Sequence, residues 1–289
     1  MDSKLTDRTI NPAPTEDSDN LLLSAHLWLR YGKKHPVLCD VEVDIRRGEV
    51  LGLIGQSGSG KSTLAMAILG LLDRKRTQVE GTVRFDGADL LRLSESDLRA
   101  LRGRKVALVL QSPLSSLNPA LKIRTQLKEA WRAHASGPKA DCEAAIRAAL
   151  QSVSLPATDD FLRKYPSQMS VGQAQRVLIA MAVMHRPALL IADEATSALD
   201  VITQSEVLAL FRELNRTTGM SILYISHDLA SVAGICDRIA ILHQGQIVES
   251  GPTTQVLTNP QHEYTQRLMA ALPRIPVRDL EKSTAAAAR

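Results

Sequence analysis

The chain has 289 residues and a formal net charge of +4, and its 44% apolar and 23% charged residues are ordinary for a globular protein of one large or two smaller domains. Basic residues are interspersed with acidic ones and aromatic residues make up only 3% of the chain, so nucleic acid is not expected as a partner. No apolar run approaches the roughly 18 residues that cross a bilayer, which argues against a transmembrane span.

The first segment, residues 1–20, is polar, contains two prolines and lacks the apolar core of a signal peptide. We predict a disordered leader there, in a cytosolic protein whose membrane association comes through a partner. The three cysteines, Cys39, Cys142 and Cys236, lie far apart and form no C-x-x-C pair. Reduced, packed thiols are therefore expected instead of a metal site or a disulfide framework.

The apolar pattern then predicts strands that alternate with helices. Residues 21–55 are expected to form short strands broken by turn residues, the last of them a fully apolar strand at 50–54. A helix is expected at 62–72, and a strand ending on an Asp-Gly turn at 81–87. Further buried strands are expected at 106–110, 189–193 and 222–226. Helical stretches flank these strands, which predicts an α/β fold with a mostly parallel sheet.

A glycine-rich segment follows the strand at 50–54, with the residues Gly55, Gln56, Ser57, Gly58, Ser59, Gly60, Lys61, Ser62 and Thr63. It fits the pattern G-x-x-x-x-G-K-[ST], in which backbone N–H groups and a helix N-terminus surround phosphate oxygens. In this pattern Lys61 reaches the β- and γ-phosphates and the Ser62 hydroxyl ligates Mg²⁺. The motif predicts nucleotide binding without identifying the enzyme.

The strand at 189–193 ends in two carboxylates, Asp193 and Glu194. Acids at the carboxyl end of a strand lie where open α/β sheets bind ligands. We expect Asp193 to hold the Mg²⁺ hydration shell and Glu194 to orient or deprotonate the attacking water, because phosphoryl transfer depends on positioning and charge stabilisation. A strand that simply ends in solvated acids is the alternative, which the upstream phosphate loop disfavours.

The segment Met169-Ser170-Val171-Gly172-Gln173 resembles the L-S-G-G-Q signature of ATP-binding-cassette (ABC) ATPases, and the resemblance extends over about residues 21–273. It implies a RecA-like P-loop NTPase core, an antiparallel β subdomain and an α-helical subdomain at about 112–184. Residues 274–289 stay an unassigned tail. The resemblance also implies that Ser170, Val171, Gly172 and Gln173 contact ATP bound by a second ABC ATPase subunit, identical to this chain or not.

The same resemblance assigns roles to residues outside these motifs. Tyr31 lies where an aromatic ring stacks on adenine, and Gln111 matches a glutamine that touches Mg²⁺ and senses the membrane subunit. Ser197 and Asp200 belong to a segment, the D-loop, that links two active sites, and His227 matches a switch histidine that contacts the γ-phosphate. The expected catalytic residues are Glu194, His227 and Lys61, and the expected Mg²⁺ ligands are Ser62, Gln111 and Asp193.

Two residues depart from the family pattern. Val171 replaces the first glycine of the signature pair, and Ala195 replaces the proline that usually follows the catalytic glutamate. The β-branched valine lies near the phosphate of the partner's nucleotide, so it is expected to weaken closure or to make one site asymmetric. Neither departure removes a catalytic group, so hydrolysis is expected to survive.

Two further segments resemble the oligopeptide, dipeptide and nickel importer ATPases: Gln111 to Pro119, which contains S-L-N-P, and Asn259 to Gln266, where Glu263 replaces a usual proline. They imply an ATPase at the cytoplasmic face of the membrane that powers uptake of a peptide or a related small solute, such as nickel or a metal chelate. The implied partners are two transmembrane permeases and, indirectly, an extracytoplasmic solute-binding protein. ATP and Mg²⁺ are the expected cofactors. No cysteine follows Cys236, so the iron–sulfur cluster of some branch members is not expected.

Three alternatives remain beside this interpretation. A nucleotide clamp with little or no hydrolysis is favoured by Val171 and disfavoured by the intact Glu194 and His227. A nucleic-acid mechanoenzyme is disfavoured because the chain has one phosphate loop and only a compact helical stretch between Gln111 and Ser170. An exporter ATPase is disfavoured because no transmembrane segment is fused to the chain.

Overall fold

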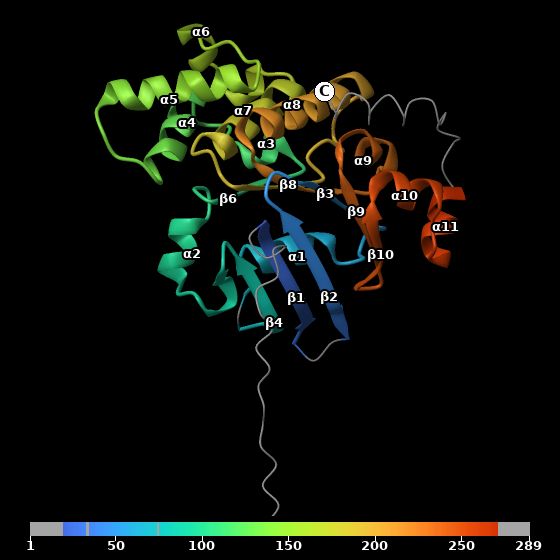
Figure 1. Cartoon of the computed structure of the whole chain (residues 1–289). Helices are drawn as coiled ribbons and strands as arrows, with labels where there is room; N and C mark the ends of the chain where they lie inside the picture. Colours follow the sequence, from blue (N-terminus) through green and yellow to red (C-terminus); the bar gives the residue numbers. More distant parts are fainter. Residues whose placement is uncertain (1–19, 33–34, 74, 271–289) are drawn as a thin grey trace, which may run out of the picture.

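Two sheets and a group of helices make up the computed structural model, which describes residues 20–32, 35–73 and 75–270 (Figure 1). The larger sheet has six strands in the order β10-β9-β3-β8-β7-β6. Its strands are β3 (Val50–Ile54), β6 (Val106–Val109), β7 (Leu189–Asp193), β8 (Ser221–Ser226), β9 (Arg238–His243) and β10 (Gln246–Pro252). All neighbouring pairs are parallel except β9 with β10. The predicted α/β fold with a mostly parallel sheet is thus confirmed.

The central strands are apolar because both faces of the sheet are covered, one by helices and the other by the helix that follows β3 and by the second sheet. Every residue of β3, β7 and β8 is buried. Parallel sheets need crossover helices on their faces, so continuous apolar runs are the expected sequence for such strands. As β3, β7 and β8 are neighbours, their carboxyl ends bring residues 55, 194 and 227 to one edge of the sheet.

The smaller sheet is antiparallel, with the order β2-β1-β4-β5. Its strands are β1 (Leu21–Tyr31), β2 (Pro36–Arg46), β4 (Thr77–Phe85) and β5 (Ala88–Asp89). Buried residues alternate with exposed ones along β2, so one face packs on the core while the other meets solvent. The buried face encloses, together with α1 (Lys61–Ile68), a second apolar cluster that includes Leu23, Leu27 and Leu64.

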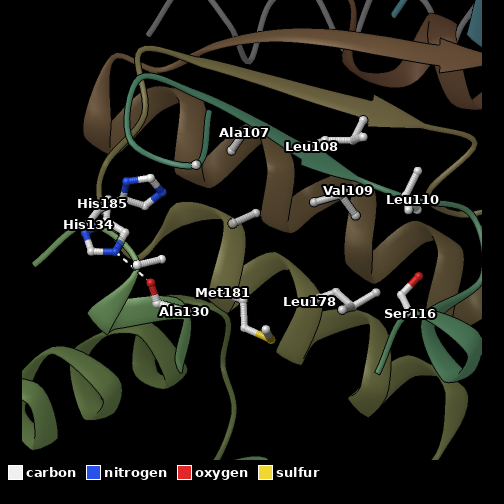
Figure 2. Close-up of a pocket in the computed structure, with 13 residues that line it drawn as sticks. Ala107, Leu108, Val109, Leu110, Ser116, Ala130, His134, Leu178, Met181 and His185 are labelled. Atoms are coloured by element: carbon white, nitrogen blue, oxygen red, sulfur yellow. Dashed lines mark hydrogen bonds between the residues drawn. The ribbon is translucent and has the colours of Figure 1, made fainter. Parts of the chain in front are cut away.

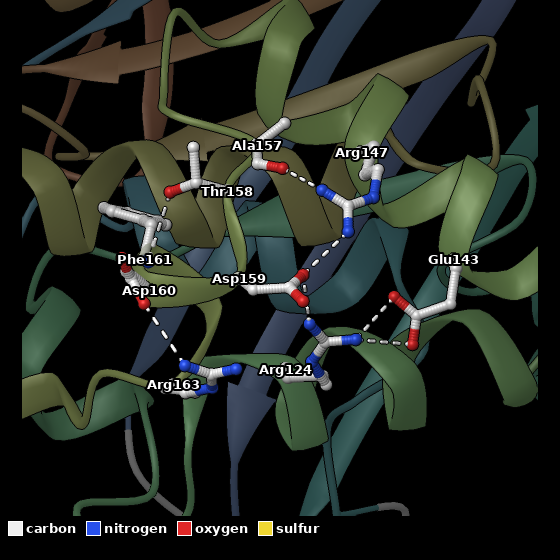
Figure 3. A network of polar contacts seen from close by, with 9 residues as sticks. All are labelled: Arg124, Glu143, Arg147, Ala157, Thr158, Asp159, Asp160, Phe161 and Arg163. Atoms are coloured by element: carbon white, nitrogen blue, oxygen red, sulfur yellow. Dashed lines mark hydrogen bonds and ion pairs between the residues drawn. The ribbon is translucent and has the colours of Figure 1, made fainter.

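A helical group lies above the larger sheet in Figure 1, on the side opposite the antiparallel sheet. It contains α3 (Pro113–Ser116), α4 (Ile123–Arg132), α5 (Lys139–Ser152), α6 (Asp159–Leu162), the short helix η2 (Pro166–Gln168) and α7 (Val171–Val183). Charged side chains link α4, α5 and α6 (Figure 3). Arg124 of α4 donates to both carboxylate oxygens of Glu143 on α5, at 2.8 and 2.7 Å, and to Asp159 of α6 at 2.7 Å. Arg147 of α5 also donates to Asp159, at 2.7 Å.

The remaining helices complete the layers around the sheets. They are η1 (Leu90–Arg92), α2 (Glu95–Leu101), α8 (Val201–Thr218), α9 (Leu229–Ile235), α10 (Thr253–Thr258) and α11 (Glu263–Ala270). Within the described residues, no helix has the length and apolar character needed to span a bilayer. The predicted leader at 1–20, apart from Asn20, and the tail at 274–289 lie outside the described residues.

Several element boundaries differ from the sequence prediction for identifiable reasons. The helix expected at 62–72 ends at Ile68, because Gly70 takes a positive φ of 61° and turns the chain. The strand expected at 81–87 begins at Thr77, where it pairs with Tyr31 of β1. The short strands expected before β3 are two strands of 11 residues each. Strands β9 and β10 are not among the predicted elements.

Candidate functional site

The glycine-rich loop connects the end of β3 to the start of α1. Gly58 and Gly60 have φ angles of 80° and 110°, which L-residues with a Cβ atom rarely adopt. A Cβ atom on Gly55 would lie 2.3 Å from the backbone oxygen of Leu242 on β9. These glycines therefore let the loop fold tightly against the sheet, with its backbone free to surround an anion.

Lys61, the first residue of α1, is only 5% exposed and turns back over this loop. Its Nζ atom donates to the backbone oxygens of Gly55 at 2.8 Å and Gln56 at 3.0 Å. The pKa of Lys61 is lowered because burial disfavours the charged form, and the nearby carboxylates of Glu194 and Asp193 offset only part of that effect. The ammonium group thus lies beside the loop and the two acids, where a phosphate chain would find a cation.

Asp193, the last residue of β7, is 7% exposed, and its Oδ1 atom has no hydrogen-bond partner among the described residues. Burial raises the pKa of Asp193, and a hydrogen bond from the Ser62 side chain opposes that rise. Ser62, Asp193 and Gln111 line one cavity of about 370 Å³, together with glycines of the loop. A hydroxyl, a carboxylate with a free oxygen and an amide are oxygen donors of the kind that Mg²⁺ takes beside phosphate and water, so the site fits this ion.

Glu194 follows the strand end with a φ of 48°, an uncommon conformation for a non-glycine residue. Its backbone N–H donates to the Ile225 oxygen at 3.0 Å, which fixes the residue against β8. Its Oε1 atom lies 3.4 Å from Nδ1 of His227. Both side chains line a second cavity of about 410 Å³, which also includes Ser57 of the loop. The carboxylate and the imidazole can therefore act on the same bound group.

The signature segment forms the start of α7 and lies outside both cavities. Ser170 is the N-cap: its Oγ accepts from the backbone N–H of Gln173 at 3.2 Å, and the Gln173 side chain accepts from the Ser170 N–H at 3.3 Å. Val171 is 38% exposed at the first helical position. Val171 and Gly172 are the first two residues of α7, so their backbone N–H groups lie at the helix N-terminus, where an anion is stabilised.

The cavities include most of the predicted nucleotide-binding residues and exclude others. Those that line one or both of them are Gly55, Ser57, Gly58, Gly60, Lys61, Ser62, Thr63, Gln111, Asp193, Glu194 and His227. Predicted residues that line neither are Tyr31, Ser59, Ser170, Val171, Gly172, Gln173, Ser197 and Asp200. Ser59 lies within the loop, and its buried Oγ has no hydrogen-bond partner among the described residues. The signature and D-loop residues are those expected to act on a partner's nucleotide.

Four lining residues are not among the predicted site residues: Ile54 and Gln56, which adjoin the phosphate loop or lie in it, and two from distant segments. Val37 of β2 borders the first cavity and Leu268 of α11 borders the second. Both are aliphatic residues in segments far from the motifs, so no residue pattern marks them. Their position follows only from the packing of β2 and α11 beside the phosphate loop.

The fold and the site define a nucleotide-binding P-loop protein. A family model described as "ABC transporter" matches residues 38–197, and one described as "Oligopeptide/dipeptide transporter, C-terminal region" matches residues 248–288. The first match covers more than half of the chain. The chain therefore belongs to the ABC transporter family and is an ATP-binding cassette ATPase.

Known proteins agree with this assignment. The chain is 36% identical over 260 residues to the oligopeptide transport ATP-binding protein OppD of Lactococcus lactis subsp. cremoris, covering 89% of this chain and 77% of the relative. It is 42% identical over 233 residues to the dipeptide transport ATP-binding protein DppD of Haemophilus influenzae, covering 81% and 71%. A solved dimer of the ATP-binding cassette MJ0796 in a post-hydrolysis state, bound to ADP and Pi, matches with a TM-score of 0.69 at 26% identity and covers 81% of this chain and 98% of that one.

Proposed function

We propose that the chain is the ATP-hydrolysing subunit of an ABC importer that takes up peptides or a related small solute through partner permeases at the cytoplasmic face of the membrane. The main support for this function is that Lys61, Asp193 and Glu194 line one cavity. The C-terminal segment of the chain also matches the oligopeptide/dipeptide transporter region. Its relatives are named as oligopeptide and dipeptide transport ATP-binding proteins.

The phosphate-binding groups of the chain act by position and charge. The loop N–H groups and Lys61 bind the phosphate oxygens, and the positive end of the α1 dipole faces them. Ser62, Asp193 and Gln111 would hold Mg²⁺. When bound, this ion neutralises charge that develops on the phosphate oxygens. These interactions align the γ-phosphate with the carboxylate of Glu194.

Glu194 is the group that prepares the attacking water. Its carboxylate accepts a proton from, or a hydrogen bond of, a water positioned in line with the γ-phosphate. The Nδ1 atom of His227 lies 3.4 Å from that carboxylate, and its imidazole would contact the γ-phosphate. The attacking oxygen forms its bond to phosphorus as the bond to the β-phosphate oxygen breaks, which releases ADP and phosphate.

A second cassette completes each site in this proposal. Ser170, Val171, Gly172 and Gln173 would contact the γ-phosphate of ATP bound by the partner, and Ser197 and Asp200 would lie near the partner's phosphate loop. ATP favours the closed pair because its γ-phosphate is bound from both sides, and hydrolysis removes that link. Opening and closing of the pair is the motion that the permeases receive.

This chain has a groove next to Gln111 that is a candidate docking site for a permease (Figure 2). The groove holds about 270 Å³ and lies between β6, the last strand of its sheet, and helices α4 and α7. Its walls are mostly aliphatic, with Leu110 and Leu178 toward one end and His134 and His185 at the other (Figure 2). Because Leu110 directly precedes Gln111, a helix docked here would sense a change at the nucleotide site.

Steady-state ATPase activity of the purified chain, alone and with candidate partner subunits, tests the proposal beside the variant Glu194→Gln. We expect wild type to hydrolyse ATP and the variant to bind ATP while losing at least about 100-fold in kcat, because the amide cannot accept the proton. Wild type that binds ATP and never hydrolyses it with any partner would support a nucleotide clamp, with Val171 as its first explanation.

A further inference from the structure

The first turn of α8 lies between two functional segments of the same chain. Two neighbouring residues of this turn face different elements. A Cβ atom on Gly172 of the signature segment would lie only 2.5 Å from the Thr203 methyl group, so the Gly172 backbone packs directly against the Thr203 side chain. The Gln204 side chain donates from Nε2 to Oδ2 of Asp228 at 3.0 Å, directly after His227. One helical turn therefore contacts both the signature segment and the His227 loop.

The contact between α7 and α8 continues one turn further along both helices. Arg176 of α7 donates to Glu206 of α8 at 3.0 Å and to the backbone oxygen of Val153 at 3.0 Å. The Arg176 side chain is only 15% exposed, so this ion pair is partly shielded from water. The start of α7 is thus held against α8 at two levels, and the same arginine binds the end of α5.

The Thr203 side chain cannot turn freely away from Gly172. Its hydroxyl donates to Oδ2 of Asp200 at 2.7 Å, while Oδ1 of Asp200 accepts from the backbone N–H groups of Ile202 and Thr203 at 3.1 and 3.0 Å. This N-cap fixes both the start of α8 and the direction of the Thr203 methyl group. A shift of the signature segment therefore pushes on the whole first turn of α8.

The other end of the connection is the Asp228 carboxylate, which caps α9. It accepts from the backbone N–H groups of Ala230 at 3.0 Å and Ser231 at 3.3 Å. Within the described residues, the Gln204 amide adds the hydrogen bond that ties this cap to α8. His227, 58% exposed and adjacent in sequence, has its imidazole 3.4 Å from the Glu194 carboxylate. Its position depends on the loop that Asp228 anchors.

We propose that Gln204 is a positioning residue for ATP hydrolysis. Its hydrogen bond to Asp228 holds the His227 loop against α8. Through α8, this bond links His227 of one active site to the signature segment that the same protomer presents to its partner. This inference rests on the ATP-hydrolysing function proposed above. Gln204 lines neither cavity, so it acts through His227 and leaves the binding of the nucleotide to the phosphate loop.

The variant Gln204→Leu tests the proposal because leucine keeps most of the side-chain volume and removes the donor. We expect kcat for ATP to fall about tenfold, which corresponds to about 1.4 kcal/mol. KM is expected to change by less than about twofold, because the phosphate-binding groups are untouched. The control is Ser205→Ala on the same turn, whose hydroxyl bonds only to the Ile202 oxygen of its own helix among the described residues. This control should hydrolyse ATP like wild type.

A swap of donor and acceptor separates this role from a merely structural one. Gln204→Glu places a second carboxylate against Asp228 and should slow hydrolysis at least as much as Gln204→Leu. Adding Asp228→Asn restores one hydrogen bond with reversed polarity, and asparagine remains a good helix N-cap. The double variant should return to within about threefold of the wild-type kcat.

Two results would overturn the proposal: Gln204→Leu with wild-type kcat, or a double variant as slow as Gln204→Glu alone. Both can be read only in a chain that hydrolyses ATP. Wild type without hydrolysis would instead overturn the proposed function. Suppose that wild type hydrolyses ATP, Glu194→Gln does not, and Gln204→Leu hydrolyses it at the wild-type rate. This result would leave the proposed function intact and reject the positioning role of Gln204.

Discussion

Replacement of Gly172 by alanine measures how tightly the signature helix packs against α8. The added Cβ atom would lie 2.5 Å from the Thr203 methyl carbon, which is about 1 Å closer than carbon atoms pack. Overpacking of this kind costs about 1–3 kcal/mol. The higher helix propensity of alanine opposes it by up to about 1 kcal/mol. A net loss of about 1–2 kcal/mol should lower the melting temperature by roughly 2–8 °C in a chain of this size.

The assay is thermal unfolding of the nucleotide-free chain, with two comparison variants. Gly234→Ala in α9 is the matched control, because a Cβ atom there would meet no atom within 4 Å beyond its chain neighbours and the backbone of its own helix. It should melt at or above the wild-type temperature. Thr203→Ser removes the clashing methyl group and keeps the hydroxyl that donates to Asp200, so it should rescue Gly172→Ala. A Gly172→Ala variant that melts as high as Gly234→Ala would refute the close packing of α7 on α8.

Two further predictions concern carboxylates. Asp193 has a raised pKa because it is buried, so its ionisation costs stability as pH rises from the ordinary aspartate value of about 4 through the raised pKa. Asp193→Asn should therefore raise the melting temperature of the nucleotide-free chain at neutral pH, with a gain that vanishes in acid; a lower melting temperature at neutral pH would contradict this. Asp159 has a pKa lowered by hydrogen bonds from the two arginines that it bridges, so its stabilisation is present above the ordinary pKa and disappears as pH falls through the lowered one. Asp159→Asn should destabilise the chain at neutral pH more than the control Asp160→Asn, whose carboxylate is 92% exposed, and equal melting curves would argue against the network in Figure 3.

The sequence carries the nucleotide site because its groups follow one another along short segments. A glycine-rich loop between a strand and a helix has one main physical use, and Lys61 and Ser62 occupy fixed positions within it. Asp193 and Glu194 were predictable because an apolar strand ends on them, and parallel strands end at the same edge of a sheet. The order of these motifs along the chain was sufficient to indicate the family.

The limits of the strands and helices were less predictable because tertiary pairing sets them. Thr77 to Glu80 extend the strand because they pair with β1, across Gly81, a residue type that usually weakens a strand. Strands β9 and β10 depend in the same way on β3, which provides the edge that β9 joins. Gly70 ends α1 early by its left-handed conformation, and a lone glycine in an apolar segment does not reveal this by itself.

The sequence by itself was enough to predict the chemistry of the site: which groups are expected to bind phosphate, which carboxylate is expected to activate water, and which segment is expected to meet a partner's nucleotide. Each of those roles depends on residue type and local spacing, so a short stretch of chain is enough to specify it. Only the tertiary structure decided that Gly172 packs on Thr203, that Gln204 bonds to Asp228, and that Leu268 borders the same cavity as Glu194 and His227. The two segments in each of the first two contacts are 31 and 24 residues apart in number, and such pairs meet only when the helices that carry them pack together.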